Sequence, residues 1–222
     1  MSQDFVLEEC SLVRCGTGRV CTNLRELLEA VRSAGAAVLE HHMMRCALED
    51  HFELYEFPND LARWCWDALG DHELAEKLAL LNPYNFRDID RLRTELSNPL
   101  EDHLWSLERV PWSRPGLELH LVESRLVASD TGERFSTLAG LTEALPRMSR
   151  RSLFYHFHEA YRRNGVDDFS MWLERKAAPQ ELIDRIRALD FYFLNLNQLR
   201  QQMLDALCAF LAEPQAVLGG PR

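Results

Sequence analysis

The sequence predicts an α+β protein that is predominantly helical and built from two tandem repeats of a hairpin-plus-helices unit, related by a pseudo-two-fold axis. Three observations lead to this prediction. The chain matches itself when shifted by 114 residues, each copy opens with an extended apolar segment, and the remainder of each copy carries apolar residues at helical spacing. A chain of 222 residues with 46% hydrophobic and 27% charged residues is also long enough to bury a core.

The internal match is collinear over nearly the whole unit. Residues 5–48 fall on residues 119–162 without a gap, and the two segments share 12 identities in 44 positions. Six extra residues near 49–56 then shorten the shift to 108, at which Asp60 and Trp64 meet Asp168 and Trp172. Matches in one order along so much of the chain predict an internal duplication.

The duplication places the domain boundaries. We expect a first repeat unit at residues 1–109, a linker at 110–116, a second repeat unit at 117–212 and a tail at 213–222. Two prolines and a glycine disfavour regular structure in the linker, and the tail ends in Gly-Gly-Pro-Arg. We expect the two units to pack as one globular body.

Each copy opens with a predicted hairpin. The stretch 5–14 has the Val, Leu and Cys content of a strand, and Thr17-Gly18 then offers a turn whose glycine is free to adopt positive φ. Thr131-Gly132 repeats this turn in the second copy. Each hairpin alone would be marginal, so we expect the two to pair or pack together.

Helices follow each hairpin, and their ends are marked by capping residues. A first helix is expected after Thr22 or Asn23, and a later helix in each copy is expected to start at Asn59-Asp60 or Asp167-Asp168. Gly70 is expected to be a glycine C-cap, and Asp71 and Pro179 are each expected to start a short helix. Pro99 is expected to kink or end the last helix of the first copy.

Composition and cysteine usage predict the compartment. The N-terminus shows no basic leader followed by an apolar run, and no stretch approaches the ~18–20 apolar residues that cross a bilayer, so we expect no signal peptide and no membrane segment. Six cysteines in a chain with ample core are typical of reduced thiols, which predicts a cytoplasmic protein. A formal net charge of −10 argues against general nucleic-acid binding.

A histidine cluster is the sharpest candidate functional feature. His42 and His156 occupy equivalent positions in the two copies, so a pseudo-two-fold axis could bring two imidazoles to a common junction, beside His158 and Glu159. Two imidazoles suit a metal, a phosphate or a general acid–base pair. The alternative is a partly buried histidine that each copy needs for packing. On a helix, residues two apart diverge, so His156 and His158 would point in different directions.

A repeated Asp-x3-Trp pattern is the second candidate. Asp60 with Trp64, and Asp168 with Trp172, could hold a sugar by hydrogen bonding and ring stacking. The same spacing results from a helix N-cap followed by a core tryptophan, which is the interpretation we favour.

The sequence lacks the common motifs of phosphate-binding proteins, hydrolases and metalloenzymes. The chain has no glycine-rich phosphate loop, no Gly-x-Ser-x-Gly elbow, no His-Glu-x-x-His and no Cys-x-x-Cys pair. The sequence therefore predicts no cofactor and no metal ligands, and leaves open whether the protein is an enzyme.

Two motifs give a family resemblance. The segments Tyr155-His156-Phe157-His158-Glu159-Ala160 and Asp167-Asp168-Phe169-Ser170-x-Trp172-Leu173, with Phe57-Pro58-Asn59-Asp60 through Trp64 in the first copy, resemble a family of bacterial and archaeal proteins known as a domain of unknown function. The resemblance covers nearly the whole chain and implies no activity. The first copy departs from the pattern with His41-His42-Met43-Met44.

These observations favour a non-catalytic cytoplasmic binding or adaptor protein. Its partner, a protein or a small molecule, is unknown, and Trp64, Trp66 and Trp105 could supply aromatic anchors beside a groove between the copies. Two alternatives stay open. One is a small-ligand-binding protein or enzyme with a histidine-lined site at the inter-repeat junction, and the other is a metal-binding regulator that uses His41, His42, Cys46 and His51.

Overall fold

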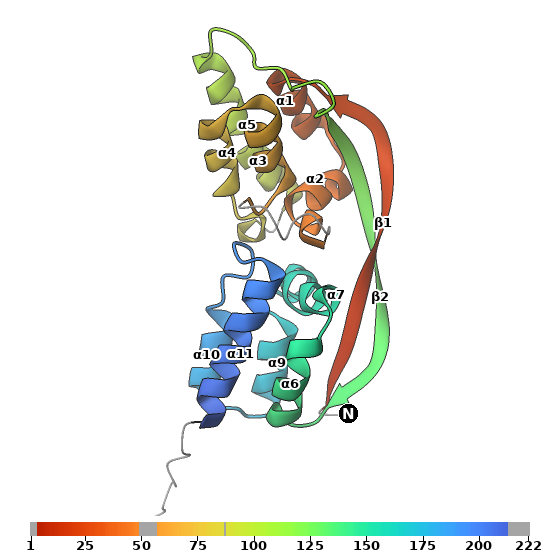
Figure 1. Cartoon of the computed structure of the whole chain (residues 1–222), viewed down its shortest axis with the longest axis vertical. Coiled ribbons are helices and arrows are strands. Elements are labelled where there is room, and N and C mark those ends of the chain that lie inside the picture. Colours follow the sequence, from red (N-terminus) through yellow and green to blue (C-terminus); the bar gives the residue numbers. More distant parts are fainter. Residues whose placement is uncertain (1–3, 49–56, 87, 213–222) are drawn as a thin grey trace, which may run out of the picture. The chain divides into compact units, whose positions relative to one another are not determined.

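The computed structural model describes residues 4–48, 57–86 and 88–212, and it has the predicted α+β class, with helices and a two-stranded antiparallel sheet (Figure 1). The chain divides into two compact units. Unit 1 consists of Met1–Glu9, Ser129–Phe191 and Leu196–Arg222, and unit 2 of Cys10–Ala128 and Tyr192–Asn195. Each unit therefore combines the helices of one predicted repeat with strand residues from both.

The predicted hairpins are wrong. Strand β1 runs through Phe5–Cys21 and strand β2 through Leu119–Phe135, and the two continuous strands pair with each other. Gly18 and Gly132 do have positive φ, +76° and +85°, but they lie inside the strands. A left-handed glycine serves a β-bulge as well as a turn, so the Thr-Gly pattern alone could not separate the two.

The threonines beside these glycines tie the strands together instead of reversing the chain. The Thr17 hydroxyl donates to the Leu121 carbonyl at 2.9 Å, and the Thr131 hydroxyl donates to the Leu7 carbonyl at 2.7 Å. Both hydroxyl oxygens also accept a backbone N–H from the residue two positions further on, at 3.2 Å. This local hydrogen bonding satisfies the backbone where the strand is irregular.

Unit 2 is a helical assembly packed around one apolar core. Its regular helices are α1 (Leu24–Ser33), α2 (Ala36–Met43), α3 (Asp60–Trp64), α4 (His72–Ala79) and α5 (Ile89–Ser106). Short 3₁₀ and π turns complete it: η1 (Arg45–Leu48), η3 (Cys65–Leu69) and η4 (Pro83–Asn85). The core includes Leu119 and Leu121 from β2 as well as Leu24, Leu74 and Leu96 from the helices.

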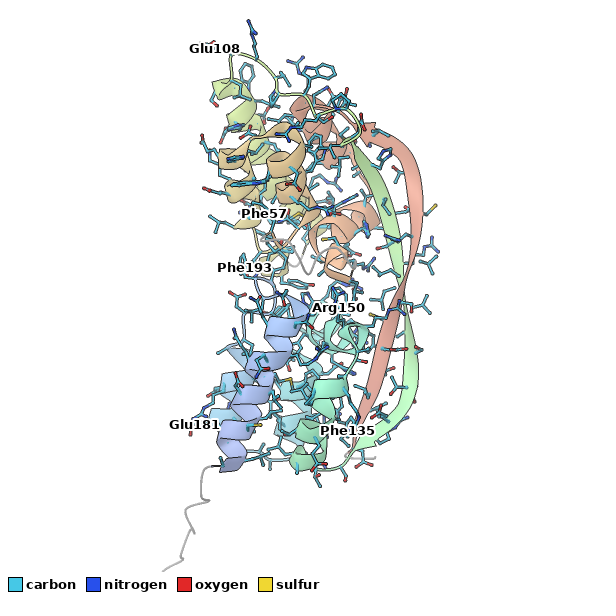
Figure 2. All side chains as sticks on the ribbon, viewed as in Figure 1. Phe57, Glu108, Phe135, Arg150, Glu181 and Phe193 are labelled. Atoms are coloured by element: carbon cyan, nitrogen blue, oxygen red, sulfur yellow. The ribbon has the colours of Figure 1, made fainter. Side chains whose placement is uncertain are left out.

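Unit 1 repeats this organisation with different helix lengths. Its helices are α6 (Leu138–Ala144), α7 (Arg150–Phe154), α8 (Ala160–Asn164), α9 (Asp168–Arg175), α10 (Gln180–Arg187) and α11 (Leu196–Ala212). A 3₁₀ turn, η5 (Leu145–Arg147), and a π turn, η6 (Tyr155–Glu159), connect them. Phe5 from β1 stacks on Phe169 of α9 at 4.9 Å between ring centroids. Phe135, which Figure 2 labels at the end of β2, is also buried.

Most predicted helix boundaries are confirmed. Asn23, Asn59, Asp71 and Asp167 are N-caps whose side chains accept backbone N–H groups, and Pro179 occupies an N-cap position as well. Gly70 ends η3 with a φ of +67°. Each of these residues caps a helix through hydrogen bonds or backbone angles that involve only its near neighbours, so the position can be predicted from the sequence.

Pro99 does not end its helix. α5 continues through Pro99 to Ser106, because Leu96 and Leu100 on either side are fully buried and their packing outweighs the missing backbone hydrogen bond.

The predicted linker is held against unit 2. Residues 110–116 form no helix or strand, but Trp112 makes an isolated antiparallel bridge with Asn23, and Ser113 N–H donates to the Thr22 carbonyl at 2.7 Å. The predicted tail at 213–222 and His51 lie outside the described residues. Within the described residues, no helix combines the length and the hydropathy that crossing a membrane requires.

Candidate functional site: two histidine–aspartate pairs and a recess in unit 2

His42 of α2 and Asp60 at the start of α3 form a buried pair in unit 2. His42 Nδ1 lies 2.9 Å from Asp60 Oδ2, and the two side chains are 4% and 7% exposed. On its other side, His42 Nε2 accepts the backbone N–H of Val122 in β2 at 3.0 Å. The His42 imidazole therefore links α2 to α3 and to β2.

His156 and Asp168 make the same arrangement in unit 1. His156 Nδ1 lies 2.8 Å from Asp168 Oδ2, and His156 Nε2 accepts the backbone N–H of Glu8 in β1 at 3.0 Å. An arginine adjoins the carboxylate in each unit: Arg63 is 2.7 Å from Asp60, and Arg163 is 3.5 Å from Asp168.

These contacts fix the protonation of both imidazoles. A nitrogen that accepts a backbone N–H carries no proton, so the ring proton of His42 and of His156 is on Nδ1 and is donated to the carboxylate. Burial alone would raise the pKa of Asp60, but the hydrogen bond from His42 and the nearby Arg63 charge hold that pKa below its ordinary value. Each histidine thus bridges a strand amide and a carboxylate.

Each of the two histidines predicted for a common site is bonded within its own unit. His42 is bonded within unit 2, and His156 is bonded within unit 1. Both ring nitrogens of each histidine have partners there, so a ligand that used either imidazole would have to replace one of these hydrogen bonds.

His158 and Glu159 are also buried, but they face other neighbours than His156 does. His158 stacks on Phe154 with 4.6 Å between ring centroids and meets the edge of Phe191 at 5.0 Å. Glu159 is 4% exposed, and its Oε2 accepts from Arg162 Nε at 3.1 Å. The divergence of His156 and His158 follows from the helical backbone of this segment, which here includes the π turn η6.

Both tryptophans of the Asp-x3-Trp pattern are core residues. Trp64 is 6% exposed and donates Nε1–H to the Leu117 carbonyl at 2.7 Å, and Trp172 is 3% exposed with an edge-on contact to Phe5. The N-caps of the two helices are Asn59 and Asp167, which directly precede Asp60 and Asp168. Of the three tryptophans predicted as anchors, Trp64 is therefore buried, Trp66 is partly buried, and Trp105 is 83% exposed.

A recess of about 410 Å³ opens beside the unit 2 pair. It is lined by His41, His42 and Asp60, by the cations Arg14 and Arg63, by residues 116–118 just before β2, and by residues 119, 120 and 122 of β2. A volume of this size can take a small ligand. Three of the predicted site residues, His42, Asp60 and Trp64, line this recess.

His41, which the sequence suggested only for the metal-binding alternative, is also buried in unit 2. It is 2% exposed, its Nδ1 lies 3.2 Å from Ser124 Oγ, and its ring is 5.0 Å from the His42 ring. Burial lowers the pKa of His41 to about 4, helped by the positive charges of Arg14 and Arg45. Cys46, proposed as a metal ligand with His41 and His42, instead donates its thiol to the His42 carbonyl at 3.3 Å.

The pairing of the histidines with the aspartates was also missed. His42, His156, Asp60 and Asp168 were each singled out by the internal match, but the sequence assigned the aspartates to helix caps. A usable signal was present, because a histidine and an aspartate that recur together at matching positions of the internal match are candidates for mutual contact.

Comparison with known proteins places the chain in a family. The model of a family of unknown function, DUF5752, matches residues 2–208. The chain belongs to this family. A solved structure, that of OrfY from Thermoproteus tenax, is similar with 27% sequence identity and a TM-score of 0.69 over 92% of this chain and 94% of that chain. No curated protein matches this chain in sequence. Membership in DUF5752 confirms the resemblance seen in the sequence.

Titration of His158 gives a first prediction. Burial lowers the pKa of His158 to about 3, against about 6.5 for an unfolded chain, so the unfolded state binds one more proton between these values. Stability should therefore fall as the pH drops below about 6.5, with a contribution of up to about 1.4 kcal/mol per pH unit from this group.

Urea unfolding of the wild type and of His158→Phe between pH 7.5 and pH 4.5 measures this contribution. The variant should show a shallower loss of stability on acidification, whatever its stability at pH 7.5. His120→Gln, at an exposed histidine, is the matched control and should keep the wild-type slope. Equal slopes for the wild type and His158→Phe would contradict the prediction.

Proposed function

We propose that this protein is a non-catalytic binding protein that engages a macromolecular partner through exposed tryptophan on unit 2. The observation that carries the proposal is Trp105, which is 83% exposed in the last turn of α5. Trp112, in the segment that follows α5, is 67% exposed. Tryptophan is enriched among the residues that dominate binding energy at protein interfaces, and large exposed indoles are uncommon on inert surfaces.

The histidine–aspartate pairs support a non-catalytic role. A general base needs an available nitrogen within reach of a substrate proton. His42 and His156 each use Nε2 to hold a strand amide and Nδ1 to hold a carboxylate, which accounts for their occurrence in both units without any reaction.

The test compares capture of proteins from an extract of the native host by four baits: wild type, Trp105→Ala, Trp112→Ala and Leu80→Ala. Leu80 is a matched control because it is 76% exposed on the same unit. A tryptophan hot spot is worth about 2 kcal/mol or more, so Trp105→Ala should weaken binding of the captured partner at least about thirtyfold, with an unchanged melting temperature. Equal affinity of the wild type and Trp105→Ala for every captured protein would refute the proposal.

We further infer that the two halves of the chain descend from one duplicated module, with repeat units at 1–109 and 117–212, a linker at 110–116 and a tail at 213–222. The two 17-residue strands have the same pattern of buried and exposed positions, which supports the inference. Arg93 and Arg200, equivalent in sequence, both donate to backbone carbonyls, of Val31 and Met148 respectively.

A cytoplasmic location is part of the proposal. All six cysteines are free thiols, which suits a reducing compartment. The formal net charge of −10 supports a partner other than nucleic acid.

A further inference from the structure

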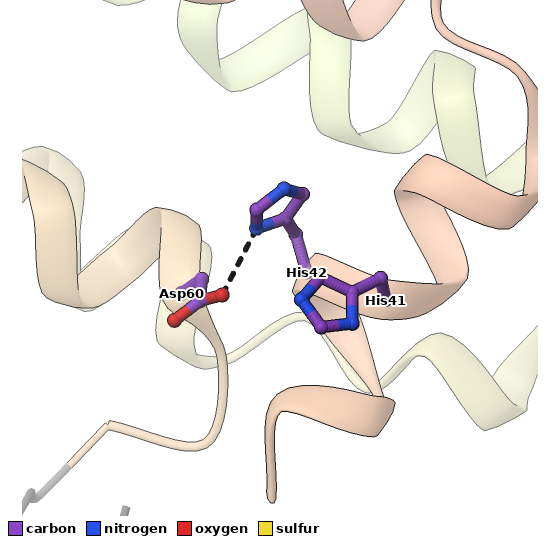
Figure 3. Close-up of side chains that lie close together, drawn as sticks. All are labelled: His41, His42 and Asp60. Carbon is purple, nitrogen blue, oxygen red and sulfur yellow. Dashed lines mark hydrogen bonds and ion pairs between the residues drawn. The ribbon is translucent and has the colours of Figure 1, made fainter. Parts of the chain in front are cut away.

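Three ligand-type side chains converge at one point of unit 2. His41, His42 and Asp60 are all buried, and one ligand atom from each lies within 4.8 Å of the others (Figure 3). We propose that His41, His42 and Asp60 form a binding site for a divalent transition-metal ion of the zinc class. This proposal goes beyond partner binding at Trp105, and it concerns a different part of unit 2.

The donor set suits such an ion. Imidazole and carboxylate are first-row metal ligands, and two histidines with one carboxylate leave coordination positions for water or a ligand. At metal–ligand distances of 2.0–2.2 Å and angles of 90–110°, neighbouring donor atoms are about 3.0–3.5 Å apart. His42 Nδ1 and Asp60 Oδ2 are already 2.9 Å apart, so this edge of the coordination shell needs little adjustment. The third donor lies within 4.8 Å of the other two, so a side-chain adjustment of His41 would complete the set.

The surroundings provide access and negative charge. The three residues line the recess of about 410 Å³, so water can reach the ion and fill its open positions. Asp67 and Glu118 also line the recess, and with Asp60 they bring three carboxylates against the two guanidinium groups of Arg14 and Arg63. The recess therefore has more fixed negative than positive side-chain charge, which favours a cation over an anion.

Unit 1 provides an internal comparison. His156 and Asp168 reproduce the His42–Asp60 pair, but the residue before His156 is Tyr155, whose hydroxyl accepts from Arg163 at 2.8 Å. The residue before His42 is His41. Unit 2 thus places a second imidazole, which also contacts Ser124 of β2 at 3.2 Å, beside an arrangement that unit 1 maintains with one.

Metal binding at His42 Nδ1 would act on the strand. The ring proton would move from Nδ1 to Nε2, which could then no longer accept the N–H of Val122. The ion would replace the hydrogen bond to Asp60 by two coordinate bonds and would release β2 at Val122. Occupancy of the site is therefore coupled to how firmly β2 is attached within unit 2.

Equilibrium dialysis against Zn²⁺ tests the site in the full chain. The exposed thiols Cys15 and Cys208 are first replaced by serine, because thiolates bind zinc on their own. We expect one equivalent of Zn²⁺ in this background and at least a hundredfold weaker binding in His41→Tyr, which gives unit 2 the Tyr-His pair of unit 1. His72→Ala, at an exposed histidine outside the recess, should keep one equivalent.

The second measurement is hydrogen exchange at the Val122 amide, which should accelerate when Zn²⁺ is added to the Cys15→Ser/Cys208→Ser protein and not when it is added to His41→Tyr. His41→Gln, which keeps a hydrogen-bonding side chain opposite Ser124, replaces His41→Tyr if the latter does not fold. Less than a tenth of an equivalent of Zn²⁺ in the His41-containing protein would overturn the proposal. Equal binding by a folded His41 variant would overturn it as well.

Discussion

Replacing His156 with alanine is expected to destabilise unit 1 by about 3–5 kcal/mol. The imidazole is 2% exposed and satisfies two groups at once, the N–H of Glu8 and the carboxylate of Asp168. Its removal leaves the Glu8 amide without its acceptor and takes the closer hydrogen bond from the Asp168 carboxylate, which keeps the Arg163 contact at 3.5 Å. A buried group left unsatisfied costs more than the hydrogen bond it had made. The substitution also removes ring contacts with Phe5, at 4.7 Å, and with Phe169, at 5.5 Å.

Chemical denaturation of His156→Ala, Asp168→Ala and the double variant isolates the pair. We expect a coupling free energy of at least about 1 kcal/mol, because the two side chains share a hydrogen bond away from bulk water. His120→Ala, at an exposed position of β2, is the control and should change stability by less than about 0.5 kcal/mol. A stable His156→Ala protein, or additive effects of the two single substitutions, would show that the histidine does not support the fold.

The parts of the fold that were predictable are those set by neighbouring residues. Asn59 and Asp167 cap helices because their side chains accept N–H groups three residues along the chain, and Gly70 ends a helix because it adopts positive φ. The candidate site was predictable to the same degree: the internal match identified the positions of His42 and Asp60, but not the contact between them.

The remaining errors concern pairings between residues far apart in sequence. Whether Thr17-Gly18 reverses the chain depends on which strand lies beside it, and that strand is more than 100 residues away. Helix α5 likewise continues through Pro99 because tertiary packing overrides a local preference. The grouping of His41 with Asp60 is a further pairing of this kind. Asp60 follows His41 by 19 residues, and the segment between them differs in length between the two matching halves of the sequence.

Substitution of Phe5 tests which helices each strand end supports. Phe5 is 4% exposed, stacks on Phe169 and meets Trp172 edge-on at 5.9 Å, so it belongs to the core of unit 1 although it precedes every helix of unit 2 in the chain. Phe5→Ala should cost about 3–5 kcal/mol in unit 1, because it removes a large buried ring and leaves a cavity among aromatic neighbours. Hydrogen exchange followed by mass spectrometry should show faster exchange in α6–α11 and unchanged exchange in α1–α5.

Leu119→Ala is the reciprocal variant. Leu119 occupies the same place at the start of β2, is 7% exposed and packs in the core of unit 2. The shorter side chain predicts a loss of about 2–5 kcal/mol, now with faster exchange in α1–α5 and little change in α6–α11. If each repeat instead folded only with its own strand, the two variants would have exchanged effects: Phe5→Ala would loosen α1–α5 and Leu119→Ala would loosen α6–α11. The helices that respond to each substitution therefore distinguish two arrangements. In one, the first residues of each strand pack on the helices that follow that strand directly, and in the other they pack on the helices of the other half of the chain.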